Sequence, residues 1–223
     1  MDYILSPCTY TAEGLASIMG RDCLRPIQLN SKSLDSLMLA SSFSARRLVV
    51  FLPDDPLLFF KTLQQTAFLL KRTINPVSTI ILTNSPSGWL WNTLAKLVTN
   101  RRLLSEVRSI PTALPLKSIA EQLDNNSLSG GWGLEEQAKK EKIYNCPSSG
   151  LTKAELNAIL HFILEHNFSN LSKQRGIKSG TLYNQKKSGL EKISKHYPLL
   201  SVHFPGNFEA KQRVKNISIS PLG

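Results

Sequence analysis

The sequence predicts an α/β fold, with a doubly wound (βα)5 domain over residues 1–124 and a small all-α domain over residues 151–223. Short apolar runs alternate with amphipathic stretches through the first part, which is the pattern of a parallel sheet with crossover helices. Residues 125–150 are rich in Asn, Ser and Gly and include Pro147, as in a linker. Beyond them, apolar side chains recur at helical spacing. With 223 residues in all, each part is long enough to bury its own core.

Five apolar segments of residues 1–124 are predicted to be strands. Leu48–Leu52 is the clearest, because a continuous apolar run is expected of a parallel strand that is buried on both faces. Leu103–Val107 is the weakest of the five. The remaining segments are Asp2–Leu5, Arg25–Leu29 and Ser78–Leu82.

A helix is expected after each strand, and local signals mark some of the helix ends. Asp54-Asp55-Pro56 is a start signal, since Asp caps helices and Pro is favoured in the first turn. Gly20 is an end signal. One charged stretch of the linker, Glu135–Lys142, is also predicted to be helical. The helices expected between strands are Thr11–Met19, Ser33–Ala40, one that begins near Pro56 and includes Leu70, one between Pro86 and Leu97, and one that contains Leu116–Leu123.

The charge balance favours a polyanionic partner. The chain has 27 Lys and Arg against 16 Asp and Glu, a net charge of +11, and its pI is near 9.7. Residues 1–124 carry 13 basic and 9 acidic side chains (+4), and residues 125–223 carry 14 and 7 (+7). The positive charge is therefore denser in the second part, as expected of a domain that binds nucleic acid. The alternative is that surface lysines only keep the protein soluble.

The sequence does not support several other classes of protein. Cys8, Cys23 and Cys146 are widely spaced and predict neither a disulfide framework nor a zinc site. No stretch approaches the roughly 20 apolar residues of a membrane span, and the N-terminus lacks the features of a signal peptide. No catalytic triad or phosphate-binding loop is legible. We therefore expect a cytoplasmic protein that is not an enzyme, needs no cofactor or metal, and does not enter a membrane.

The stretch Leu151–Ile193 carries the strongest functional signal. Thr152 and Glu155 form a Thr-x-x-Glu capping box, which marks the start of a first helix. Gly176 permits a tight turn between a short second helix, which Ser169 can cap, and a third helix. A third helix with a polar, basic outer face beside such a turn is suited to enter a major groove. The residues predicted to point inward are Leu171, Ile177 and Leu182.

This stretch resembles the helix-turn-helix of the LuxR/GerE family, which is shared by NarL- and FixJ-type response regulators. The sequence departs from the family at Ser172, Lys178, Gln185 and Gly189. Of these, Gly189 is expected to destabilise the third helix by about 1 kcal/mol relative to Ala. The matching features are Leu151-Thr152, Glu155, the region of Ile159, Leu171, Gly176-Ile177, Thr181-Leu182 and Lys192-Ile193.

The resemblance implies that three side chains of the third helix reach base edges. These are Tyr183, Asn184 and Lys187. Asn can pair bidentately with adenine, and Lys can donate to the acceptors of guanine. Ser179 belongs to the same candidate DNA-binding face. For Tyr183 the alternative is a ring that packs on the neighbouring helix.

The resemblance places a second group of side chains near phosphates. Lys178, Thr181 and Lys186 would fix the register of the helix on the duplex and make binding salt-dependent, without reading sequence. For Lys173, Arg175 and Lys192, an ordinary solvated helix face is an equally good interpretation.

Five βα units followed by a helix-turn-helix resemble a response regulator with a receiver-like N-terminal domain. The chemistry of a phosphorylated receiver is largely absent, however. Phosphoryl transfer to an aspartate needs carboxylates after the first strand to hold Mg2+, but Leu5 is followed by Ser6-Pro7-Cys8-Thr9. Asp54 and Asp55 lie where helix capping explains them. We therefore expect a receiver-like domain that works by docking a partner protein.

Two segments carry a second resemblance: the N-terminus, with Ile4-Leu5, Cys8-Thr9-Tyr10-Thr11 and Gly14-Leu15, and the turn, with Ile177–Thr181. They resemble RcsA-type auxiliary regulators, whose N-terminal domain is not phosphorylated. This resemblance implies a transcriptional activator that binds double-stranded DNA as a heterodimer with an RcsB-type response regulator. Two alternatives stay open. One is a stand-alone response regulator that acts as a homodimer after phosphorylation of Asp54 or Asp55, and the other is a module that sequesters another regulator without binding DNA.

The C-terminal tail departs from the LuxR/GerE pattern. His196-Tyr197-Pro198 and Phe204-Pro205-Gly206 interrupt the region where the family has its fourth, dimer-forming helix. Asn207–Asn216 could form that helix later in the chain. The interruption argues against the homodimer contact of the family and leaves room for a heterodimeric one.

Overall fold

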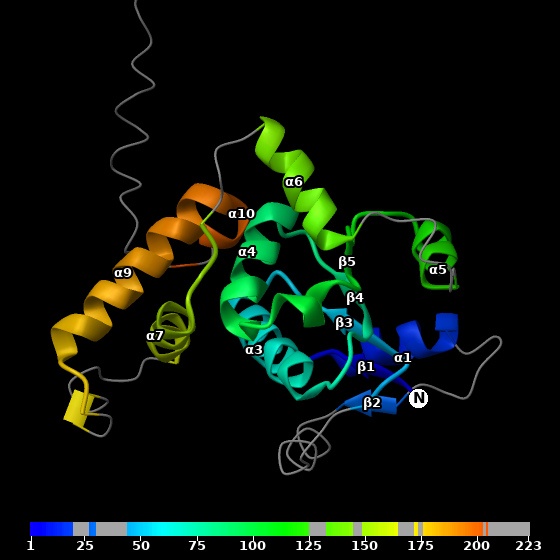
Figure 1. Cartoon of the computed structure of the whole chain (residues 1–223), viewed down its shortest axis with the longest axis horizontal. Coiled ribbons are helices and arrows are strands. Elements are labelled where there is room, and N and C mark those ends of the chain that lie inside the picture. The colour runs from blue at the N-terminus through cyan, green and yellow to red at the C-terminus, as the bar shows by residue number, and fades with distance from the viewer. Residues whose placement is uncertain are drawn as a thin grey trace, which may run out of the picture.

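The fold is given by a computed structural model, which describes residues 1–19, 27–29, 44–124, 133–144, 149–164, 172–173, 176–202 and 204. Its centre is a parallel five-stranded sheet with the strand order β2-β1-β3-β4-β5 (Figure 1). The predicted α/β class and doubly wound arrangement are confirmed. The strands are β1 (Asp2–Leu5), β2 (Ile27–Leu29), β3 (Arg47–Phe51), β4 (Ser78–Leu82) and β5 (Val107–Ile110).

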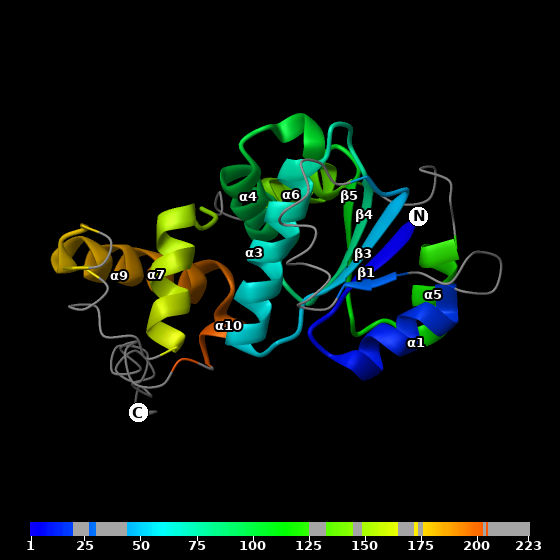
Figure 2. The same ribbon diagram turned by 90° about the horizontal axis from the view of Figure 1, so that it is seen from below.

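Helices cover both faces of the sheet, and each face has its own apolar layer (Figure 2). Helices α1 and α5 lie on one face, where Ile4, Val49 and Ile80 point from the strands. Helices α3 and α4 lie on the other face, where Val50 and Ile81 point. This alternation follows from the period of two in a strand. The helices are α1 (Thr9–Met19), α3 (Pro56–Arg72), α4 (Ser87–Val98) and α5 (Leu116–Asp124).

Most of the predicted elements of this part are confirmed, including the capping of α3. Asp55 is the N-cap, and its carboxylate accepts a hydrogen bond from the backbone N–H of Leu58 at 2.8 Å. Pro56 takes the first helical position, where its missing N–H has no consequence. The predicted helix Ser33–Ala40 lies outside the described residues.

The position predicted for the fifth strand was wrong. Residues Arg101–Leu104 form a short 3-10 helix, η1, and β5 begins only at Val107. The side chain of Asn100 caps this turn by accepting from the N–H of Arg102 at 3.2 Å. The turn buries Leu103 and Leu104, so a pair of buried leucines in a turn produced the apolar run that resembled a strand.

The helix predicted in the linker is confirmed as α6 (Leu134–Tyr144), which packs along α4 and against β5. The carboxylate of Glu141 accepts from the backbone N–H groups of Ser87 and Gly88, at the N-terminus of α4. Negative charge is favourable there because the first N–H groups of a helix have no partner within it. Gln137 accepts from the hydroxyl of Ser109 at 2.6 Å. Helix α6 is thus part of the surface of the sheet domain.

The C-terminal helices pack directly on α3 and α4, so one apolar core extends through both parts of the chain. Each part is long enough to bury a core of its own, but here the two parts share this one. The ring of Tyr197 packs against both Phe59 and Trp89, with centroid distances of 5.8 and 5.6 Å, and the ring of Phe204 lies 6.3 Å from that of Phe60. The C-terminal helices are α7 (Lys153–Ile163), α9 (Ser179–His196) and α10 (Pro198–Ser201).

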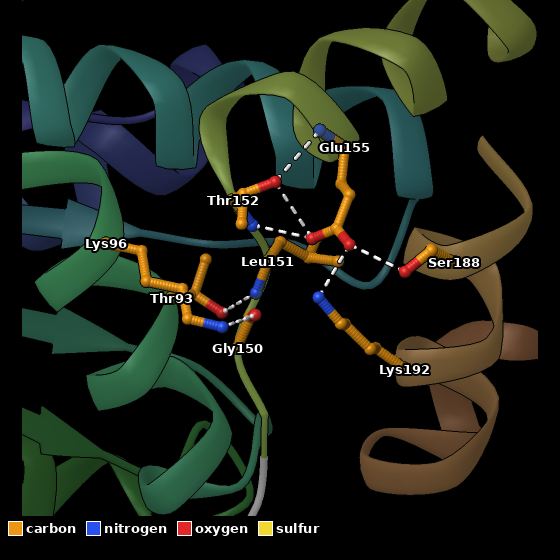
Figure 3. A network of polar contacts seen from close by, with 8 residues as sticks. All are labelled: Thr93, Lys96, Gly150, Leu151, Thr152, Glu155, Ser188 and Lys192. Carbon is orange, nitrogen blue, oxygen red and sulfur yellow. Dashed lines mark hydrogen bonds and ion pairs between the residues drawn. The ribbon is translucent and has the colours of Figure 1, made fainter. Parts of the chain in front are cut away.

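The start of α7 is also tied to α4 by polar contacts (Figure 3). The hydroxyl of Thr93 accepts from the N–H of Leu151 at 3.1 Å, and the ammonium of Lys96 donates to the carbonyl of Gly150 at 2.7 Å. Desolvation by burial lowers the pKa of Lys96, and the nearby Lys192 ammonium lowers it further. Within the described ranges, no helix is both long and apolar enough to cross a membrane.

Candidate nucleic-acid interface

The first helix of the candidate interface, α7, begins at the predicted capping box. The hydroxyl of Thr152 accepts from the N–H of Glu155 at 3.2 Å, and the Glu155 carboxylate accepts from the N–H of Thr152 at 2.8 Å (Figure 3). These reciprocal bonds satisfy two donors that have no partner within the helix. Leu156, Ile159 and Leu160 lie on the buried side of α7.

The turn before α9 depends on a glycine, as predicted. Gly176 has a φ of +64°, a left-handed conformation that side-chain-bearing residues rarely adopt. The N–H of the next residue, Ile177, donates to the carbonyl of Ser172 at 3.2 Å and closes the turn. Ser172 and Lys173 are helical, whereas Ser169 and Leu171, assigned to the second helix, lie outside the described residues.

The N-terminal half of α9 is held against α7 by one buried side chain. Leu182 is buried and packs against Phe162 and Ile177. Leu182 therefore points inward as predicted, while Ile177 is half-buried. This contact fixes which face of α9 is turned away from the rest of the protein.

The predicted DNA-binding residues gather on that outward face. Six of the seven are exposed, and 54% of the surface of Tyr183 is accessible. Lys186 differs from the others because it is half-buried. The six exposed residues are Lys178, Ser179, Thr181, Tyr183, Asn184 and Lys187.

The ammonium of Lys186 lies over two aromatic rings. It is 4.3 Å from the centroid of the Phe162 ring and 5.6 Å from that of Tyr183. Both distances are within the range of about 6 Å for attraction between a cation and the face of a ring. Such contacts could not be found from sequence, because Phe162 and Lys186 belong to different helices.

The C-terminal half of α9 is joined to α7 through a buried carboxylate. Glu155, only 7% exposed, accepts from the ammonium of Lys192 at 2.6 Å and from the hydroxyl of Ser188 at 2.7 Å (Figure 3). Burial raises the pKa of Glu155, but the hydrogen bonds from Lys192, Thr152 and Ser188 outweigh it, so the pKa is lowered overall. Lys192 is therefore a structural partner of α7, which corrects its interpretation as part of a solvated face.

Gly189 has a packing role that the sequence did not reveal. A Cβ atom at this position would lie 2.7 Å from Cδ1 of Ile159 and 3.2 Å from Cβ of Glu155. Both distances are shorter than ordinary van der Waals contact. Glycine lowers the helix propensity at this position. It also lets α9 lie closer to α7 than a residue with a Cβ atom would allow.

The loops that follow β1, β3 and β4 carry polar side chains. Asp54 is exposed and accepts from the amide of Asn84 at 3.4 Å. After β1, the Ser6 hydroxyl donates to the carbonyl of Cys8 at 2.9 Å and closes a turn on itself. Within the described part of the chain, no three His, Cys, Asp or Glu residues are grouped so that they could hold a metal ion.

No protein-family model matches the chain, and no curated protein matches it. Solved structures, in contrast, do match the chain. RcsB from Salmonella enterica serovar Typhimurium, bound to promoter rprA in the presence of the phosphomimetic BeF3−, is 14% identical over 92% of this chain and 98% of that chain, with a TM-score of 0.50. The chain has an RcsB-like fold. A second RcsB structure from that organism, bound to promoter P1flhDC, is 14% identical over 90% of this chain and 98% of that chain, with a TM-score of 0.48.

Proposed function

We propose that this chain is a sequence-specific DNA-binding transcription regulator whose helix α9 enters the major groove. One observation carries the proposal: the predicted base-reading and phosphate-contacting side chains lie together on the outward face of a helix that is anchored at its other end. Helix α9 contains five lysines or histidines against one acidic residue, Glu191, and points its N-terminal half away from the sheet (Figure 1). Such a helix suits a groove lined by phosphates.

The roles within this face follow from the chemistry of each side chain. Tyr183, Asn184 and Lys187 are proposed to contact base edges, where amide, ammonium and phenol groups can distinguish donors from acceptors. Lys178 and Thr181, together with Ser179 at the helix start, are proposed to contact phosphates, which fix register without reading sequence. A helix N-terminus adds unpaired N–H groups that favour an anion.

The sheet domain is proposed to receive a partner protein, an RcsB-type response regulator, in place of a phosphoryl group, and the pair is proposed to act as an activator in the cytoplasm. The turn after β1 offers the hydroxyl of Ser6 and the thiol of Cys8 where Mg2+ would need carboxylates. Asp55 is occupied as the cap of α3, and Asp54 lacks acidic neighbours after β1. Phosphoryl transfer needs the cation to neutralise the developing charge.

The proposal is tested by the binding of promoter fragments to the purified full-length chain, alone and with an RcsB-type partner, at two salt concentrations. Salt-sensitive, sequence-specific binding that requires the partner is the expected result. Tight specific binding by the chain alone would favour a homodimeric regulator instead. Specific binding in neither case would contradict the proposal and favour a module that sequesters another regulator.

Replacing Lys187 by glutamate should weaken specific DNA binding by about tenfold to a hundredfold. The ammonium that donates to a base edge is replaced by a carboxylate, which cannot donate and is repelled by the phosphates. Affinity for the selected duplex is the measurement. Lys195→Glu is the matched control, since it makes the same charge change at an exposed site near the other end of α9. Equal effects of the two variants would show that only net charge matters at Lys187.

A further inference from the structure

The chain makes a strained turn between α4 and η1. Thr99 has a φ of +66° and is the only described residue other than glycine with a positive φ. The N–H of Asn100 donates to the carbonyl of Val98 at 2.7 Å, so Thr99 is the central residue of a γ-turn of the rare, strained kind. A β-branched residue is especially unfavourable in this conformation. The Thr99 side chain is exposed, so its burial does not explain the strain.

The turn is followed at once by two exposed arginines. Leu103 and Leu104 of η1 are buried in the core, and the side chain of Asn100 accepts from the N–H of Arg102, so η1 is held firmly on the sheet domain. Arg101 and Arg102 are exposed. Neither forms an ion pair with a residue that the structure describes.

These arginines belong to a larger basic surface of the sheet domain. Because η1 packs against both α3 and α4, it lies beside the last turn of α3, where Lys71 is exposed. Ile74 follows this helix and is 80% exposed. Residues 61–108 hold seven Lys and Arg against one acidic residue, Glu106. We call the residues of this edge the α3–η1 surface: Lys71, Ile74, Arg101 and Arg102.

The charge of this surface is not explained by the helices alone. A basic side chain in the last turn of a helix is favourable because the carbonyl groups there carry partial negative charge. This accounts for Lys71 at the end of the 17-residue α3. It does not account for Arg101 and Arg102, because η1 has only four residues. Strained non-glycine residues cluster at functional sites, so the turn at Thr99 also indicates a role for the arginines that follow it.

We propose that the α3–η1 surface docks a partner protein through Asp and Glu carboxylates that surround an apolar contact with Ile74. The proposal rests on the proposed function, in which the sheet domain receives a partner protein, and it locates that contact. A guanidinium binds a carboxylate through two parallel hydrogen bonds, and Arg is enriched in protein interfaces. The exposed Ile74 side chain offers an apolar contact that the phosphates of a duplex could not use.

The location of the α3–η1 surface suits a partner protein that is bound together with DNA. The N-terminal half of α9 projects away from the sheet (Figure 2), whereas η1 lies on the sheet domain, between α4 and β5 in the chain. A protein on the α3–η1 surface would therefore leave the outward face of α9 uncovered. The two proposed contacts can then form at the same time.

The contact is tested by calorimetric titration of the full-length chain with RcsB from Salmonella enterica serovar Typhimurium. Arg101→Glu should weaken the association by about tenfold, because attraction to a carboxylate becomes repulsion. Ile74→Ser should weaken it by about threefold to tenfold, because the apolar contact is lost. Lys117→Glu is the matched control, since it makes the same charge change at an exposed site of α5, on the other face of the sheet.

Thr99→Gly separates a role in docking from a role in stability. Glycine adopts a positive φ without strain, so this variant should melt about 2 to 5 °C higher than the wild type. It should also bind RcsB about twofold to fivefold more weakly, because a glycine holds the arginines of η1 less firmly. A purely structural turn would raise the melting temperature and leave the association unchanged, which would contradict the proposal.

The remaining outcomes distinguish this inference from the function on which it rests. Wild-type affinity for RcsB in Arg101→Glu, or an equal loss of affinity in Lys117→Glu, would overturn the inference alone. A loss of duplex affinity in Arg101→Glu, with the association with RcsB intact, would assign the surface to nucleic acid and would overturn it as well. No association of the wild-type chain with RcsB would instead contradict the proposed partner contact itself.

Discussion

Replacing Tyr197 by alanine is expected to detach the helical part of the protein from the sheet and to lower the free energy of unfolding by about 4 kcal/mol. The residue is 2% exposed and its ring packs against those of Phe59 and Trp89, so truncation would leave a cavity lined by aromatic side chains. Urea denaturation gives the magnitude, and a split of the single transition into two would show the detachment. Tyr183→Ala removes an exposed tyrosine of the same size and should change stability by less than about 0.5 kcal/mol.

The pKa of the Tyr197 phenol also shows whether the C-terminal helices are packed on the sheet domain. Burial and the negative charge of Asp54 raise its pKa to about 12, from an ordinary value of 10.0. Because the folded-state pKa is raised, the associated stabilisation is fully present below pH 10 and is lost as pH rises toward 12. Asp54→Asn should move the pKa down toward its ordinary value. A wild-type Tyr197 that titrates near 10 in folded protein would contradict the docked arrangement.

Replacing Glu155 by alanine is expected to lower the free energy of unfolding by about 3 kcal/mol, because it leaves Lys192 without its ion-pair partner and removes one half of the capping box. This change in free energy lies at the low end of the range for breaking a buried ion pair, because the Lys192 side chain is 21% exposed and can be hydrated again. Glu191→Ala, at an exposed site of α9, is the control. Equal stabilities of the two variants would contradict a structural role for the Glu155 carboxylate.

The same carboxylate predicts a pH dependence in the acid range. The folded-state pKa of Glu155 is lowered from 4.5, so its stabilisation is present above pH 4.5 and is lost as pH falls through the folded-state value. The difference in unfolding free energy between wild type and Glu155→Ala should therefore shrink as the solution is acidified. A difference that stays constant to pH 2 would mean that packing alone accounts for the effect.

The parts of the fold with local signals were predictable. The buried strands β3 and β4 show as continuous apolar runs, and the capping residues Asp55 and Thr152 mark helix starts through hydrogen bonds within four residues. The turn at Gly176 is local in the same sense. The fifth strand was misplaced because a short run of buried leucines has no period that separates a turn from a strand.

The features that could not be predicted depend on contacts between distant segments. Tyr197 meets Phe59 and Trp89 only after the helical part has docked, so no pattern near Tyr197 indicates its partners. The same holds for the position of Lys186 over Phe162 on another helix. The sequence therefore predicted that Tyr183, Asn184 and Lys187 face outward on α9, but it did not predict the contacts that hold the helix in place.

The aromatic contact at the end of α9 has a mechanical consequence. With 18 residues, α9 is about 27 Å long, and it is clamped near its C-terminal end by Tyr197 while its first turn projects away from the sheet (Figure 2). Because α9 is packed against α7 along its length, the two helices would tilt together about this contact. A tilt of about ten degrees at the clamp would swing the first turn by about 5 Å, which exceeds the rise of about 3.4 Å between neighbouring base pairs. Under the proposed DNA-binding function, a partner that shifts Tyr197 slightly would thus change which base pair lies next to the first turn of α9.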